Sequence, residues 1–160
     1  MEQKVHREVR FDEGQKNSGR DKYERKFGHV PHEFTKGIYD SWDVNVTADS
    51  GTAIVEIKDR DIQFDKYDRP GKRDGYMVEE IKYIPMMKAY NASGCTPIFM
   101  IFFQNGIGYW WDLSAYDPEE ITWEEKWCTE TTADGSYGKV KRLKKFFNVF
   151  LKDGKRFKYE

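Results

Sequence analysis

The amino-acid sequence predicts a single α/β domain over residues 1–160, with a central mixed β-sheet flanked by helices. Three patterns lead to this prediction: two alternating segments around a tight turn over 37–60, a helical pattern over 76–94, and an apolar segment over 96–103 bounded by turn residues. A chain of this length buries a sizeable core without disulfides. Although 34% of the residues are charged, 16% are aromatic, so the composition favours a folded protein over a disordered one.

The first half of the chain divides into a polar start, a short helix and a strand pair. Residues 1–17 are polar and show no clear period, and the next segment predicts a helix over 19–27 that ends at Gly28. Apolar and polar residues then alternate over 37–46 and 51–60, which predicts two strands. We expect a charged loop over 60–75.

The second half predicts a helix, two central strands and two further segments. Residues 76–94 predict a helix that Pro85 bends or interrupts. The segments 96–103 and 106–113 predict neighbouring strands joined by a turn at Asn105 and Gly106. Residues 118–130 are compatible with an acidic helix or a strand. Residues 144–159 predict a hairpin around Asp153 and Gly154, with a helix to residue 151 as the alternative.

The cysteine and hydropathy patterns indicate a cytoplasmic protein. Cys95 and Cys128 give neither a metal-ligand spacing nor a disulfide framework, and the charged first residues are unlike a signal peptide. The longest apolar run, 98–103, has the length of a strand and falls far short of the roughly 20 residues that cross a bilayer. We therefore expect no membrane partner.

The charges are unevenly distributed, although the formal net charge is only −1. Basic residues dominate 139–160, which reads as a basic C-terminal extension, whereas acidic residues dominate 112–130. Such polarity suits a protein with one phosphate-facing side, and two solvated faces of opposite sign explain it equally well. The candidate nucleic-acid contacts in the extension are Lys141, Arg142, Lys144 and Lys145.

The register of the strand pair brings two carboxylates together. A two-residue loop at Asp49 and Ser50 pairs Ala48 with Gly51, Val46 with Ala53, Val44 with Val55 and Trp42 with Ile57, so that one face is entirely apolar. The same count sets Asp43 directly opposite Glu56, with Lys58 two residues along the same face. Directly opposed Cβ atoms lie about 4.5–5.5 Å apart, and like charges there are destabilising. Such a pair needs a cation.

A divalent metal ion satisfies this need. Mg²⁺ takes carboxylate and backbone oxygens and keeps several waters, and Asp43, Glu56 and the Ile57 carbonyl supply that ligand set. Lys58 then lies beside the bound water or a substrate phosphate. A solvent-facing strand with scattered charges is the alternative, and Asp40 is a weaker rival to Asp43 because it precedes the regular alternation.

The segment "YDSWDVNVTADSGTAIVEIKDR" resembles the core of the PD-(D/E)xK nuclease superfamily, in which an aspartate on one hairpin strand and Glu-x-Lys on the next form the metal site. The order of the expected elements resembles small phage-type and Holliday-junction-resolvase-like members. The likeness covers about residues 20–112. It implies a restriction-endonuclease-like αβββαβ core and a Mg²⁺- or Mn²⁺-dependent nuclease that cleaves DNA, with branched DNA as a candidate substrate.

The resemblance also implies roles for individual residues. Asp43 and Glu56 hold the metal, Glu24 on the preceding helix is a candidate ligand through water, and Lys58 orients or deprotonates the attacking water. From their positions in the sequence, Arg60 just after the hairpin and Lys82 on the following helix are candidate phosphate contacts, with a solvated, charged surface as the alternative for both. A junction-resolving role requires a homodimer, since two symmetric cuts need two sites. The implied setting is the cytoplasm of a prokaryotic or phage-infected cell.

Other functions compete with this one. His29 and His32 could ligate a metal, and if either joined the site the resemblance would shift toward RNA endonucleases of the cap-snatching type. A non-catalytic nucleic-acid-binding protein on the same scaffold is the main alternative from another class. The acidic segment 112–130 also suits an inhibitor that mimics nucleic acid. The aromatic residues 109–111 read as core more readily than as a base-stacking platform.

Overall fold

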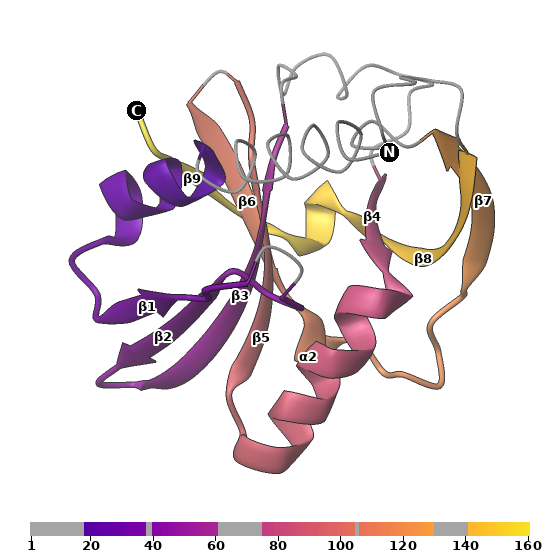
Figure 1. Ribbon diagram of the computed structural model, residues 1–160, viewed down its shortest axis with the longest axis horizontal. Helices are drawn as coiled ribbons and strands as arrows, with labels where there is room; N and C mark the ends of the chain where they lie inside the picture. Colours follow the sequence, from indigo (N-terminus) through magenta and orange to yellow (C-terminus); the bar gives the residue numbers. More distant parts are fainter. Residues whose placement is uncertain (1–17, 38–39, 61–74, 105, 130–140) are drawn as a thin grey trace, which may run out of the picture.

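The computed structural model describes residues 18–37, 40–60, 75–104, 106–129 and 141–160. It has a six-stranded sheet in the order β1-β2-β3-β5-β6-β9, called sheet A, and a three-stranded sheet in the order β4-β8-β7, called sheet B. Figure 1 shows one helix on one side of sheet A, and α2 together with sheet B on the other side. The fold is α/β with a mixed main sheet, as the sequence predicts.

The first elements agree with the predicted helix and hairpin. Helix 18–27 precedes β1 (His32–Phe34), β2 (Val44–Ala48) and β3 (Gly51–Asp59). These strands form an antiparallel meander, and the predicted pairs Ala48–Gly51, Val46–Ala53 and Val44–Val55 are confirmed. The ladder ends at Val44, so the predicted pairing of Trp42 with Ile57 and of Asp43 with Glu56 does not continue it.

A helix connects β3 to a parallel neighbour. β4 (Gly75–Glu79) belongs to sheet B, α2 (Glu80–Ser93) follows it directly, and β5 (Thr96–Phe102) then lies parallel to β3. The predicted helix over 76–94 is therefore wrong for its first residues, because Tyr76 and Val78 pack inward at strand spacing. Pro85 does not interrupt α2, which ends at Gly94 in the left-handed conformation.

The end of the chain is built into both sheets. β6 (Ile107–Asp112) pairs with β5, and β7 (Glu124–Thr129) settles the choice between helix and strand. β8 (Lys141–Phe150) is the middle strand of sheet B, while β9 (Lys155–Lys158) is an outer strand of sheet A. The predicted hairpin at Asp153 and Gly154 is thus wrong: a short 3-10 helix joins strands that pair in different sheets.

Two apolar clusters cover the two faces of sheet A. Tyr23 of helix 18–27 packs against Val44, Val55 and Ile57 on one face. On the other face a larger cluster unites residues of sheet A with α2 and sheet B; it includes Ile54, Phe99, Trp111, Val78, Tyr83, Met86 and Phe147. The strand 96–102 is buried on both faces because it lies between these clusters, as its apolar composition predicts.

Two of the remaining predictions can be compared with the structure. Within the described ranges, no helix has both the length and the apolar character needed to cross a bilayer. Cys95 and Cys128 are free thiols. The predictions for residues 1–17, for 61–74 within the charged loop, and for Asn105 lie outside the described residues.

Candidate functional site

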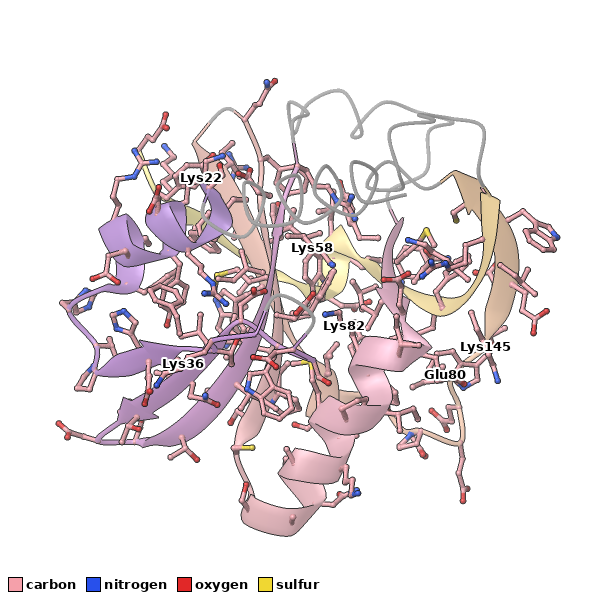
Figure 2. All side chains as sticks on the ribbon, in the orientation of Figure 1. Lys22, Lys36, Lys58, Glu80, Lys82 and Lys145 are labelled. Atoms are coloured by element: carbon pink, nitrogen blue, oxygen red, sulfur yellow. The ribbon has the colours of Figure 1, made fainter. Side chains whose placement is uncertain are left out.

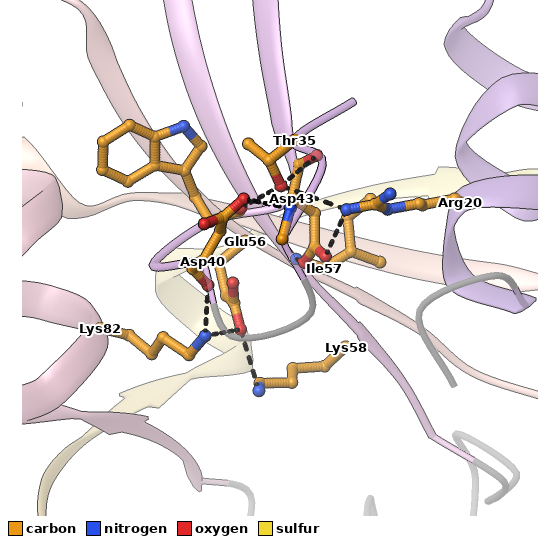
Figure 3. Close-up of polar contacts among 10 residues, drawn as sticks. Arg20, Thr35, Asp40, Asp43, Glu56, Ile57, Lys58 and Lys82 are labelled. Carbon is orange, nitrogen blue, oxygen red and sulfur yellow. Dashed lines mark hydrogen bonds and ion pairs between the residues drawn. The ribbon is translucent and has the colours of Figure 1, made fainter. Parts of the chain in front are cut away.

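Glu56 is a buried carboxylate near the end of β3. It is only 3% exposed, and its face of the strand is turned toward α2 and sheet B, since Ile54 on the same face packs there. The Oε1 atom of Glu56 lies 3.0 Å from the Nζ atom of Lys58 and 3.6 Å from that of Lys82 (Figure 3). Two lysines from different elements therefore converge on one carboxylate oxygen.

The electrostatics of this group follow from its burial and from its neighbouring charges. Burial raises the pKa of Glu56 above its ordinary value, and the nearby charge of Asp43 adds to that rise, although Lys58 and Lys82 oppose it. Burial acts to lower the pKa of Lys58, but the attraction of Glu56 outweighs it, so the net pKa is raised. Lys58 is a firmly protonated ammonium group next to a carboxylate whose negative charge is poorly solvated.

Asp43 reaches the site because β2 leaves its ladder there. The Asp43 N–H donates to the Val55 carbonyl at 2.8 Å, so Asp43 and Val44 both lie opposite Val55, as in a β-bulge. The Oδ2 atom of Asp43 accepts a hydrogen bond of 2.9 Å from the backbone N–H of Ile57, and the residue is 4% exposed. The predicted direct opposition to Glu56 is thus replaced by a contact with the next residue of β3.

Arg20 on helix 18–27 forms an ion pair with Asp43. Its Nη2 atom lies 3.7 Å from Oδ1 of Asp43 and donates to the Thr35 hydroxyl at 3.1 Å. Thr35 in turn donates to the Trp42 carbonyl at 2.8 Å, which ties β1 to the segment before Asp43. The two carboxylates thus face three protein cations, Arg20, Lys58 and Lys82 (Figure 3).

The oxygen atoms in the site fit a hard divalent cation. Since the N–H and C=O of one strand residue point toward the same neighbour, the Ile57 carbonyl lies on the side where its N–H meets Asp43. Two carboxylates and one carbonyl leave positions for water, as Mg²⁺ requires. Among the described residues no group of three or more His, Cys, Asp and Glu side chains converges.

Lys82 is held by two partners. Besides Glu56, its Nζ atom donates to the backbone carbonyl of Asp40 at 2.9 Å, while the Asp40 carboxylate accepts from the Gly37 N–H at 2.7 Å. Through this hydrogen bond α2 holds the segment that leads into Asp43 in place. The Asp40 carboxylate, the rival to Asp43, is directed to its own loop.

Glu24 and His32 pair with each other. The His32 Nε2 and Glu24 Oε2 atoms are 2.5 Å apart, and the His32 Nδ1–H donates to the Val30 carbonyl at 2.7 Å. The Glu24 side chain is 53% exposed, whereas the His32 side chain is 11% exposed. Arg20 is the helix residue that reaches Asp43.

The spacing on helix 18–27 contains the signal for Arg20. Tyr23 and Phe27 pack against sheet A, and Arg20 lies three residues before Tyr23, on the same helix face. Glu24 follows Tyr23 directly, so it lies on a different face of the helix and is turned toward solvent. The roles of Thr35 and the Asp40 carbonyl have no sequence signal, because each depends on where a loop passes.

The basic residues proposed from the sequence lie in different surroundings. Arg60 follows β3, and its backbone N–H donates to the Phe102 carbonyl at 2.9 Å. Lys144 pairs with Glu79 at 3.1 Å, whereas Lys145 pairs with Glu80 at 2.9 Å. The side chain of Lys141 lies outside the described part of the structure. The predicted extension is part of the fold, since its strands complete both sheets.

A separate cavity of about 480 Å³ lies between the segment 115–124 and β8. Its lining includes the acidic residues Asp117, Glu120 and Glu124. No residue of β2, β3 or α2 lines it, so it is distinct from the site at Glu56. The acidic stretch noted in the sequence therefore surrounds a cavity of its own, away from the two buried carboxylates.

Comparison of the chain with models of protein families, with curated proteins and with solved structures gave no match.

Proposed function

We propose that the protein is a nuclease that hydrolyses DNA phosphodiester bonds with the help of Mg²⁺ or Mn²⁺. The observation that carries this proposal is the buried pair of carboxylates, Asp43 and Glu56, with the ammonium group of Lys58 at 3.0 Å from Glu56. A bound divalent ion would lower the pKa of a water molecule and offset charge on the scissile phosphate. Asp43, Glu56 and the Ile57 carbonyl would hold that ion.

The chain order supports the resemblance to the PD-(D/E)xK superfamily. Helix 18–27, the antiparallel strands β1, β2 and β3, α2 and the parallel strand β5 follow one another as a restriction-endonuclease-like αβββαβ core would, with β4 inserted before α2. This likeness favours nuclease chemistry over other uses of a divalent ion. Branched DNA and a homodimer are part of the same proposal.

Each cation of the site has a role in this reaction. Lys58 is protonated and therefore orients the attacking water or stabilises the developing negative charge on the phosphate. When Glu56 turns from Lys82 to a metal ion, Lys82 would still donate to the Asp40 carbonyl. Lys82 would therefore remain in position to contact a phosphate oxygen. Arg20 holds Asp43 in position through the contact with its Oδ1 atom.

Cleavage assays with Lys58→Ala test the proposal. We expect wild-type protein to cut linear, branched or single-stranded DNA with Mg²⁺ or Mn²⁺, and the variant to lose about a hundredfold or more in rate while binding DNA as before. Lys88→Ala, which removes an exposed lysine from α2, should cut normally. A wild-type protein that never cuts DNA with any divalent ion, or a Lys58→Ala variant as fast as wild type, would show that the proposal is wrong.

The second candidate is a nucleic-acid-binding protein without catalysis. One observation favours it: among the described residues, Arg20, Lys58 and Lys82 already pair with the two carboxylates without a metal ion. An RNA endonuclease of the cap-snatching type is less favoured, because His32 contacts Glu24 and the Val30 carbonyl. DNA binding without Mn²⁺-induced stabilisation would identify the non-catalytic function.

A further inference from the structure

The chain between β6 and β7 is anchored to the core at both ends and polar between them. At one end the 3-10 helix η2 (Leu113–Ala115) carries the fully buried Leu113, and at the other end Trp123 packs against the same apolar cluster. Between these anchors the Asp117 carboxylate accepts from the Glu119 N–H at 3.0 Å and fixes a turn. The cavity of about 480 Å³ lies between this turn and β8.

The cavity combines an apolar lining with carboxylates. Its apolar part is formed by Tyr116, Ile121, Phe147 and Phe150. Its acidic part is formed by Asp117, Glu120 and Glu124, and none of the described residues that line it is basic. Pockets for small ligands have volumes of about 300–1,000 Å³ and are lined mostly by apolar and aromatic side chains with a few polar groups. The cavity therefore has the size and the composition of a ligand site.

The carboxylates of the lining are not all balanced by protein cations. Asp117 and Glu124 accept hydrogen bonds from neutral donors, the Glu119 N–H and, at 2.7 Å, the side-chain amide of Asn148. The Glu120 side chain forms no hydrogen bond or ion pair with another residue of the described ranges. A positively charged ligand would give Glu120 a partner.

Two tyrosines at the cavity are under the influence of negative charges. Burial raises the pKa of Tyr116 to about 12, and the charge of Asp153 adds to that rise. Burial also raises the pKa of Tyr83, with the charge of Asp117 as the second cause. The Tyr83 ring packs edge-on against Phe147, with centroids 5.2 Å apart. Both hydroxyl groups therefore stay neutral in a region where acidic charges dominate.

Two oxygen atoms of the lining residues have no hydrogen-bond partner among the described residues. They are the Tyr116 hydroxyl oxygen and the Oδ1 atom of Asn148, and both are shielded from solvent. A shielded acceptor without a partner costs free energy, so native proteins usually provide one. The N–H groups of a ligand that enters the cavity would offer these oxygens a donor.

The described basic side chains of β7 and β8 do not line the cavity. Lys145 lies 2.9 Å from Glu80 and is placed over the ring of Trp123 at 5.5 Å. Figure 2 shows Lys145 beside Glu80 near the first turn of α2. Lys126 is two residues beyond Glu124 on β7 and is also absent from the lining. The positive charge that complements the cavity is therefore expected from a ligand.

We propose that this cavity binds a small organic cation, in which an ammonium group is attached to an apolar body. The ammonium group contacts Glu120 and Glu124, and the apolar body packs on Phe147 and Phe150, whose rings also attract cations. A metal ion fits less well, because within the described ranges no three His, Cys, Asp or Glu side chains come together to hold one. The inference is independent of the proposed nuclease function, since no residue of β2, β3 or α2 lines the cavity.

NMR titration of the isotope-labelled full chain with phenethylammonium tests this proposal at neutral pH. We expect the largest amide shifts within 115–124 and 146–150. Phenethyl alcohol lacks the charge and methylammonium lacks the apolar body, so each should bind about tenfold or more weakly. Phenylacetate carries the opposite charge and should not bind.

Charge-removing variants locate the cation. Glu120→Gln/Glu124→Gln should weaken phenethylammonium binding by about fivefold to tenfold, as expected from the loss of two exposed ion pairs. The new amide at position 124 can still accept from Asn148, so the melting temperature should stay close to that of wild type. Glu119→Gln is the matched control, because Glu119 is exposed and adjacent to Glu120 but does not line the cavity. It should bind phenethylammonium like wild type.

The possible outcomes decide the proposal and separate it from the nuclease function. It is overturned if phenethylammonium does not bind up to its solubility limit, if the shifts lie elsewhere, or if phenethyl alcohol binds equally well. An equal loss in Glu119→Gln overturns it too, because the attraction would then come from general surface charge. A protein that binds phenethylammonium as expected but never cuts DNA would support the cation site and refute the nuclease proposal.

Discussion

At the scale of single residues, the candidate site combines two carboxylates with cations from three different elements among the described residues. Asp43 and Glu56 face Arg20, Lys58 and Lys82, and all five are buried or partly buried. Each carboxylate also has a distinct supporting contact: Asp43 accepts from the Ile57 N–H, and Glu56 receives both lysines at one oxygen. A substitution at Asp43 therefore separates metal binding from local structure more cleanly than one at Glu56.

Asp43→Asn should abolish stabilisation by a divalent metal with little effect on the metal-free protein. The amide oxygen of Asn still accepts the Ile57 hydrogen bond, whereas the charge that holds a metal is lost. We expect Mn²⁺ to raise the melting temperature of wild-type protein, through binding to the folded state, and not that of the variant. Calorimetry with and without Mn²⁺ measures both. Asp49→Asn at the exposed hairpin turn is the control, and equal gains in Asp43→Asn and wild type would exclude Asp43 as a ligand.

His32 should stabilise the protein in a pH-dependent way. The Val30 carbonyl and Glu24 raise its pKa above the ordinary value, and a group with a raised pKa stabilises the fold below its unfolded pKa and loses that effect as pH rises through its folded pKa. His32→Gln should cost up to about 1 kcal/mol near pH 6 and clearly less near pH 9. Urea unfolding at both pH values tests this, and an equal cost at both would contradict it.

At the scale of elements, local patterns predict the strand pair and the first helix. The spacing along that helix also indicates that Arg20 lies on the face that packs on sheet A and that Glu24 does not. The burial pattern fixes the hairpin register up to Val44, because a slip of one residue would expose the apolar face. The departure of Asp43 from the ladder has no local signal. At this point Thr35, seven and eight residues earlier in the chain, donates to the Trp42 and Asp43 carbonyls.

The packing of β9 on β6 gives a prediction for Gly108. A Cβ atom at Gly108 would lie 2.2 Å from the ring of Phe157, which faces it across the strand pair. Gly108→Ala should therefore destabilise the protein by about 1–3 kcal/mol, as overpacking does, and loosen β9. Thermal unfolding measures the cost. The double variant Gly108→Ala/Phe157→Leu should recover part of it, and no recovery would point to another cause.

At the scale of the whole molecule, sheets A and B share one core and are joined directly. The indole N–H of Trp111 in β6 donates to the Phe150 carbonyl at the end of β8, at 2.8 Å. The chain then passes through a 3-10 helix from the centre of sheet B to an outer strand of sheet A. The two sheets should therefore unfold together in a single transition.

Removal of residues 141–160 should prevent folding. β8 separates β4 from β7, and the deleted segment supplies six buried or core-packed side chains, namely Phe146, Phe147, Val149, Leu151, Phe157 and Tyr159. We expect the truncated chain to lack a cooperative thermal transition in circular dichroism. A truncated chain that melts like the full protein would mean that this segment is the extension that its sequence suggests.

Sequence patterns predict this end of the molecule least well. The alternation over 144–159 correctly indicates strands, and Asp153–Gly154 is a good turn, so pairing between the two strands is the expected result. The strands separate because Phe147 and Val149 pack into the core beside α2, whereas Phe157 packs beside helix 18–27. The assignment of these side chains to two different clusters depends on tertiary packing. No short segment of the sequence can therefore predict it. The same reason explains why the contact of Lys82 with the Asp40 carbonyl could not be predicted, whereas Asp43 and Glu56 belong to one local hairpin pattern.

The outer strands of sheet A limit how copies of this protein can associate. β1 has only three residues, and β9 carries the exposed cations Lys155, Arg156 and Lys158. Short or highly charged edges of this kind resist the addition of further strands, which protects proteins from edge-to-edge aggregation. Sheet A should accordingly not extend from one molecule into the next, even at high concentration. A two-fold dimer that places two cleavage sites on one DNA would have to form through side-chain packing on another surface.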